Sequence, residues 1–129
     1  MKTPFKVTKK EYLEFVNQTN FSDDELEIQI SNTINFILLY AQYTSSKNWR
    51  KRFEYSAVKT HQLEAFKNAV IYQLAYIESN GGDVVWMNGY NHASNTFVSN
   101  GDLFQKYLAP MSKMELANNG ILYGGVSIC

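Results

Sequence analysis

Few residues in this 129-residue chain have the type and spacing for chemistry. The histidines, His61 and His92, could bind a metal or transfer a proton. They lie at a helix start and in a loop, without the short spacing that places two ligands on one helix face. An acidic cluster spans residues 23–27, and clustered acids at a helix start usually cap and solvate the helix instead of forming an acid/base pair. We therefore expect no enzyme, no metal site and no cofactor.

Motifs for phosphate or thiol chemistry are also missing from the sequence. It contains no phosphate loop, dinucleotide fingerprint, paired-Cys motif or metalloprotease helix motif. Gly81-Gly82-Asp83 follows a helix instead of opening one, which is the wrong polarity for anion binding. The lone cysteine, Cys129, cannot form an internal disulfide or a thiolate metal cage.

One charged segment has a sharper chemical interpretation, because cations and aromatics together can hold a nucleic-acid backbone and stack on bases. It interleaves Lys47, Arg50, Lys51 and Arg52 with Trp49 and Phe53. The alternative is a solvated connection or short helix, whose charges balance the acids of the second helix and whose aromatics cover one end of the core. The formal net charge of zero supplies no overall attraction to nucleic acid.

Length and composition predict one globular domain over residues 1–129. The chain is 45% apolar and 15% aromatic, which is ample for one modest core. The first ten residues lack the apolar stretch of a secretory signal, and the most apolar run, residues 34–43, is too short to cross a bilayer. We expect a cytoplasmic product with no membrane partner.

Periodicity predicts a mainly α fold, a small helical bundle of about four helices with two long ones. Capping boxes at Thr8–Glu11 and Ser22–Glu25 start the first two helices, and the first runs to about Gln18. The second carries one apolar face: Leu26, Ile30, Ile34, Ile37 and Ala41. Further apolar residues lie off that face: Ile28, Phe36, Leu39, Tyr40 and Tyr43. This helix is either central in its own bundle or covered by another subunit.

The third helix begins near Thr60 and ends before Gly81, a residue suited to the left-handed conformation after a last helical turn. Its apolar residues recur at helical steps: Leu63, Phe66, Val70, Leu74 and Ile77. Between residues 83 and 107, Asn-Gly pairs predict a short β-hairpin or ordered loop. A third capping box, Ser112–Glu115, predicts a short last helix with Met114 among its apolar residues, closed by Gly120. Residues 121–129 read as a flexible extended tail.

An ordered series of motifs resembles the head-tail connector (adaptor, or head completion) proteins of tailed bacteriophages. The series is AVIYQLAYIESNGG, then VSNGDLF, then LAPMSKMELANNGILYGGV, and it covers roughly Leu63 to Val126 with a weaker echo in the helix from Ser22. In that family a long helix of A-x-x-x-Q-x-x-Y character precedes a Gly-centred segment, a small helix and a Leu-Tyr-x-Gly-Val-like end.

This resemblance implies a virion protein of the phage neck, made in the host cytoplasm. It would form a homo-oligomeric ring, dodecameric in the virion, that joins the portal protein to the tail or a head-closure protein. Genomic DNA would pass through the ring without sequence-specific binding. The basic residues named above would line the channel or pair between subunits. The expected assembly interface comprises Trp86, Tyr90, Phe97, Ile121, Leu122, Tyr123 and Val126.

Two alternatives stay open from the residues themselves. The chain could instead be a small nucleic-acid-binding packaging or replication accessory protein that acts through Lys47 to Arg52. The tail could either order on a partner, for example as an added strand, or fold back through Leu122, Tyr123 and Val126 to cap the bundle.

Overall fold

Helices form the framework of this computed structural model, which describes residues 3–79, 104 and 107–122. The elements in chain order are α1 (Lys9–Val16), α2 (Asp23–Ser45), α3 (Trp49–Glu54), α4 (Thr60–Ser79) and α7 (Pro110–Asn118). The described part of the chain contains no strand. The predicted mainly α bundle is confirmed. The predicted β-hairpin or ordered loop and the stop at Gly81 lie outside the described residues.

Reciprocal side-chain caps start the first two helices. The Thr8 hydroxyl oxygen accepts a hydrogen bond from the Glu11 amide at 3.1 Å, and the Glu11 carboxylate accepts one from the Thr8 amide at 2.9 Å. Ser22 and Glu25 make the same pair of bonds at the start of α2. Each cap satisfies amides that have no partner within the helix, so both predicted capping boxes are confirmed. Helix α1 ends slightly earlier than expected, with Asn17 at a φ of 71°.

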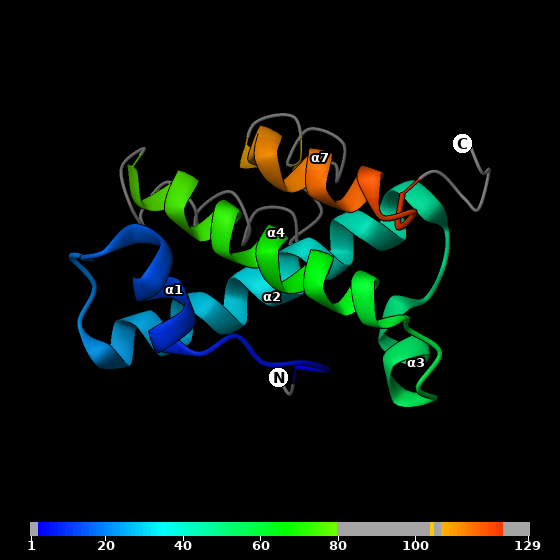
Figure 1. Cartoon of the computed structure of the whole chain (residues 1–129), viewed down its shortest axis with the longest axis horizontal. Helices are drawn as coiled ribbons and strands as arrows, with labels where there is room; N and C mark the ends of the chain where they lie inside the picture. Colours follow the sequence, from blue (N-terminus) through cyan, green and yellow to red (C-terminus); the bar gives the residue numbers. More distant parts are fainter. Residues whose placement is uncertain (1–2, 80–103, 105–106, 123–129) are drawn as a thin grey trace, which may run out of the picture.

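The long helices α2 and α4 pack on each other, and α7 packs along α4 (Figure 1). At one end of the bundle, α1 contacts both the beginning of α2 and the end of α4. At the other end, α3 follows α2 and packs against it. The chain thus has an α1 end and an α3 end, separated by the length of α2.

The predicted apolar faces of α2 and α4 form the core. All five residues of the α2 face are buried, and so are Phe66, Val70 and Leu74 of α4. Off the α2 face, Phe36 and Tyr40 are also buried, and their rings lie 5.5 and 4.9 Å from that of Phe104. The central position of α2 in its own bundle therefore accounts for most of its apolar residues.

The start of α7 differs from the prediction. The helix begins at Pro110 without a side-chain cap, so the expected capping box at Ser112 is wrong. Ser112 is buried, and its hydroxyl donates to the Ala69 carbonyl oxygen of α4 at 2.7 Å. Met114, expected on the apolar side, is exposed. The end was predicted correctly, since Gly120 follows the helix with a φ of 71°.

The first two residues of the expected tail belong to the core. Ile121 is 0% exposed, Leu122 is 4% exposed, and both pack in the same cluster as Phe66. The Ile121 amide donates to the Leu116 carbonyl oxygen at 3.1 Å, which turns the chain back after Gly120. One of the two alternatives for the tail was that it folds back onto the bundle. The structure shows this fold-back at Leu122. Residues 123–129 lie outside the described residues.

A buried glutamine joins α4 to the chain before α7. Gln73 is 0% exposed, its amide nitrogen donates to the Tyr107 carbonyl oxygen at 2.8 Å, and its amide oxygen accepts from the Ala109 amide at 2.7 Å. These bonds connect the middle of α4 to the Tyr107 carbonyl and to the amide of Ala109, the residue that caps α7. The position of α7 along α4 therefore depends on Gln73.

We predict that Gln73→Met destabilises the protein by about 2–4 kcal/mol. Methionine keeps the volume but removes both hydrogen bonds, and loss of a bond to a buried backbone group costs about 1–3 kcal/mol. Urea unfolding followed by circular dichroism measures the effect. Gln42→Met on the exposed side of α2 is the matched control and should change stability by no more than about 0.5 kcal/mol. Equal effects of the two substitutions would contradict this role for Gln73.

Candidate functional site

In the basic segment at the α3 end, the charged side chains lie at the surface and the two aromatic side chains pack against the core. Lys51 is exposed, whereas Lys47 and Arg52 lie over the Trp49 ring, with Lys47 Nζ 6.0 Å and Arg52 Cζ 5.3 Å from its centroid. The Arg50 guanidinium donates to the Asn35 side-chain oxygen. The segment is therefore a cationic surface built around one buried indole.

The two aromatics that suggested base stacking are used inside the protein. Trp49 is 1% exposed, and its indole nitrogen donates to the Ser45 hydroxyl at 3.0 Å. The Phe53 ring lies 5.1 Å from that of Phe5 and 5.3 Å from that of Phe66. These rings cover one end of the core, as the alternative interpretation expected. Neither the Trp49 nor the Phe53 ring can stack on a nucleic-acid base unless it first leaves the core.

An exposed aromatic that sequence reasoning did not single out lies beside these charges. Tyr55, the residue that ends α3, is 73% exposed. Its position directly after a short amphipathic helix was the only sequence signal for it. The α3 end thus presents a tyrosine next to lysine and arginine side chains.

The opposite end of α2 is acidic. Asp23, Asp24, Glu25 and Glu27 are all exposed. The hydrogen bond from the Ser22 amide, and a further one from its hydroxyl group, lower the pKa of Glu25, as expected for a capping residue. Exposed Ile28 lies beside these acids, in an open hollow of about 430 Å³. The lining of this hollow is Asp24, Glu27, Ile28, Ser31 and Asn32.

Glu78, which was not predicted as a site residue, links the α1–α2 connection to the end of α4. Glu78 accepts hydrogen bonds from the Tyr12 phenol and the Thr19 hydroxyl, both at 2.6 Å, and from the Asn20 amide at 2.7 Å. Burial raises the pKa of Glu78, but these three bonds outweigh it, so the pKa is lowered overall. Burial and the Glu78 carboxylate raise the pKa of Tyr12. A hollow of about 490 Å³ borders this cluster.

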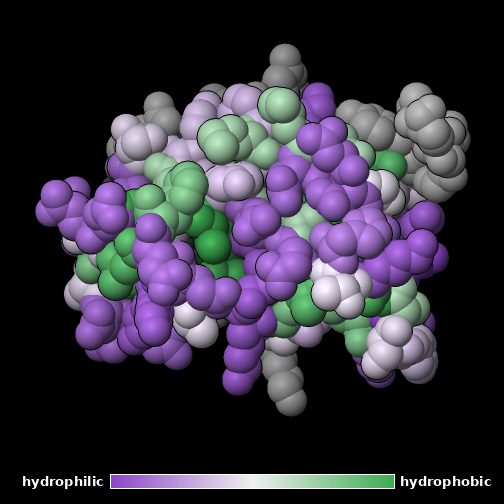
Figure 2. Space-filling view, in the orientation of Figure 1, coloured by the Kyte–Doolittle hydropathy of each residue, from purple (hydrophilic) through white to green (hydrophobic). Residues whose placement is uncertain are grey.

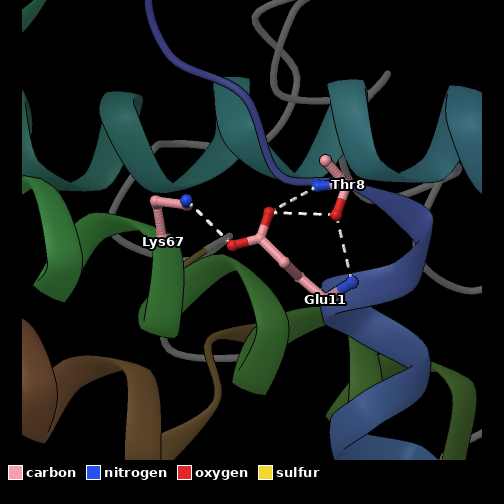
Figure 3. Close-up of polar contacts among 3 residues, drawn as sticks. All are labelled: Thr8, Glu11 and Lys67. Carbon is pink, nitrogen blue, oxygen red and sulfur yellow. Dashed lines mark hydrogen bonds and ion pairs between the residues drawn. The ribbon is translucent and has the colours of Figure 1, made fainter.

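A second carboxylate fixes the start of α1 to the middle of α4. One oxygen of Glu11 completes the helix cap with Thr8, and the other lies 2.8 Å from the Lys67 ammonium (Figure 3). Lys67 and the Thr8 amide lower the pKa of Glu11. Glu11 and Glu78 thus hold α1 to α4 at two points, and Glu78, which lines the neighbouring hollow, already accepts three hydrogen bonds.

An apolar groove opens where α1, α4 and α7 meet, on the face shown in Figure 2. Its volume is about 200 Å³, and exposed Phe15 and Met111 lie on its two sides. The Phe15 and Tyr72 rings are 5.4 Å apart across its floor. This groove can bury apolar side chains, and its lining contains no histidine, cysteine, lysine or carboxylate.

The remaining site residues fall into three groups. Ile121 and Leu122, expected at an assembly interface, are buried in their own chain. His61 is exposed with its Nδ1 3.2 Å from the Asn119 side-chain oxygen, and the described residues hold no cluster of metal ligands. The third group lies outside the described residues: Trp86, Tyr90, His92, Phe97, Tyr123, Val126 and Cys129.

Comparisons of the chain with models of protein families, with curated proteins and with solved structures find no match. Within the described ranges, no helix combines the length and apolar character needed to span a membrane.

We predict that Glu78→Gln destabilises the protein by about 1–3 kcal/mol at pH 7, because an amide nitrogen cannot accept the bonds from Thr19 and Asn20. The folded-state pKa of Glu78 is lowered, so its contribution is present above the unfolded value of about 4.3 and is lost as the pH falls through the folded value. Stability of both proteins should be measured by urea unfolding between pH 3 and 7. The difference should shrink at the acid end.

Glu64→Gln, on an exposed position of the same helix, is the control and should have little effect at any pH. A difference between Glu78→Gln and the natural protein that is as large at pH 3 as at pH 7 would contradict the role of the charge.

Proposed function

We propose that this chain is a structural virion protein of a tailed bacteriophage. In this proposal it forms a ring at the head-tail interface, joins the portal to the tail or to the next neck protein, and lets DNA pass. Its partners would be copies of itself, the portal protein and a tail or head-closure protein. It would act by surface contact and would carry out no reaction.

One observation carries the proposal: two motif positions of the connector-like helix, Ala69 and Gln73, hydrogen-bond to the next connector-like segment. In A-x-x-x-Q-x-x-Y, the alanine is Ala69, whose carbonyl accepts from Ser112, and the glutamine is Gln73, which bonds residues 107 and 109. Two motifs whose order suggested the family are therefore parts of one packed unit. That contact supports treating them as a linked signature instead of two independent coincidences.

The surface chemistry is compatible with this proposal. One described hollow is mostly apolar, one borders the Glu78 carboxylate, which already accepts hydrogen bonds, and two lie along the start of α2, one of which also contains Lys6 and Lys9. Exposed Phe15, Met111 and Met114 offer apolar area on α1 and α7. Figure 2 shows apolar residues among the polar ones over this part of the molecule. Apolar patches of this kind on a neutral protein suit contacts with other proteins.

Purified particles of the phage that encodes the chain should contain it in the neck. Imaging should show an annulus between portal and tail, and mass measurement with and without portal protein should detect a higher assembly when portal is present. A neck that lacks the protein would contradict the proposal. A variant that ends at Leu122 keeps both buried residues and tests the rest of the tail, and its unchanged assembly would remove residues 123–129 from the interface.

The nucleic-acid alternative makes a separate prediction about duplex DNA. A connector should bind a free labelled duplex weakly in an anisotropy titration. A protein that neutralised four phosphates through Lys47, Arg50, Lys51 and Arg52 would instead show a log-log salt slope of about −3.6. Lys51→Glu should then weaken binding, whereas Lys113→Glu on α7 serves as the control. Strong, salt-dependent binding lost only in Lys51→Glu would favour the alternative.

A further inference from the structure

The two ends of α2 carry opposite charge. Exposed Asp23 and Asp24 lie at its start, and Lys51 and Arg52 lie in the short helix that follows its end. Helix α2 has 23 residues and spans about 35 Å at 1.5 Å per residue. Figure 1 shows the start of α2 and helix α3 at opposite ends of the long axis of the molecule. The formal net charge of zero therefore hides a charge separation along the protein.

Asp23, Asp24 and Lys51 are exposed, whereas Arg52 is half-buried and also lies over the Trp49 ring of its own subunit. The ion pair between Lys67 and Glu11 involves neither charged end. Lys6 and Lys9 share a hollow with Glu27 but do not line the one that contains Asp24. The outer acids and Lys51 consequently face solvent, where a charged partner could reach them.

Each charged end also has an exposed apolar or aromatic side chain. At the acidic end Ile28 is 59% exposed within the open hollow described above. At the basic end Tyr55, the residue that ends α3 four positions after Lys51, is 73% exposed. The basic end thus combines cations with an exposed tyrosine, and the acidic end combines carboxylates with an exposed isoleucine. The two surfaces are complementary in charge, and each offers an apolar side chain to the other.

We propose that these two surfaces bind each other between copies of this chain, with the α3 end of one subunit on the start of α2 of the next. Tyr55 packs on Ile28, and Lys51 and Arg52 face Asp23 and Asp24. Two-fold pairing of either surface with itself would place like charges together, which disfavours it. Contact between unlike ends is heterologous, and such contacts close into rings or extend as filaments. The inference rests on the proposed ring function and assigns its subunit interface.

Sedimentation equilibrium of the full chain tests this interface. Association should weaken by about tenfold when salt is raised from about 0.05 to 0.5 M, because exposed charges are screened. Asp24→Lys alone and Lys51→Glu alone should each weaken it by about fivefold, since an attraction becomes a repulsion. The double variant Asp24→Lys/Lys51→Glu should recover the natural association, as should an equimolar mixture of the two single variants.

Lys113→Glu on exposed α7 is the control for a charge reversal away from both ends, and thermal melts check that every variant is folded. Recovery in the double variant supports the unlike-end contact, because like-end pairing cannot produce it. A natural chain that stays monomeric at millimolar concentration and low salt overturns the inference, and so does association that the single variants leave unchanged. Either result leaves the neck function to be decided by imaging of virions.

Discussion

The arrangement of the bundle depends on one buried side-chain amide. Gln73 lies in the middle of α4 and bonds backbone groups of Tyr107 and Ala109, more than thirty residues away in the chain. An apolar residue of the same size would fill the space but could make neither bond, and losing hydrogen bonds in a buried site is costly. This directional requirement fixes where α7 begins, and with α7 it fixes the burial of Ile121 and Leu122.

Two carboxylates perform the corresponding task for α1. Glu11 links the helix cap to Lys67 of α4, and Glu78 of α4 receives Tyr12 and the connection that leads into α2. Both ends of α1 are thereby tied to one helix. Since α2 starts directly after this connection, the same contacts set the direction in which its acidic first turn faces solvent. The polar contacts of Glu11 and Glu78 thus determine where the exposed acidic residues of α2 lie.

At the other end of the molecule, packing of the aromatic rings separates them from the positive charges with which they alternate in the sequence. Trp49 and Phe53 turn inward against Phe66, while Lys51 and Tyr55 stay outside. Burial of large rings is strongly favourable, and α3 is short enough to be oriented by those two anchors. The resulting surface carries charge together with exposed Tyr55 at the end of α3. It is better suited to a charged protein face than to stacking along a nucleic-acid strand.

The sequence by itself determined the helices whose signals are local. Capping at Thr8 and Ser22 and the apolar period of α2 and α4 depend on neighbours three or four residues apart, so they survive without knowledge of the fold. Tertiary structure decided the rest. Ser112 matched a local cap, yet its hydroxyl bonds Ala69 instead, and Ile121 looked like the start of a tail until α4 supplied a surface to cover it. The same holds for the cationic surface at the α3 end. Its charges can be read from the sequence, but which aromatic side chains stay exposed there depends on packing, because burial is decided by residues distant in the chain.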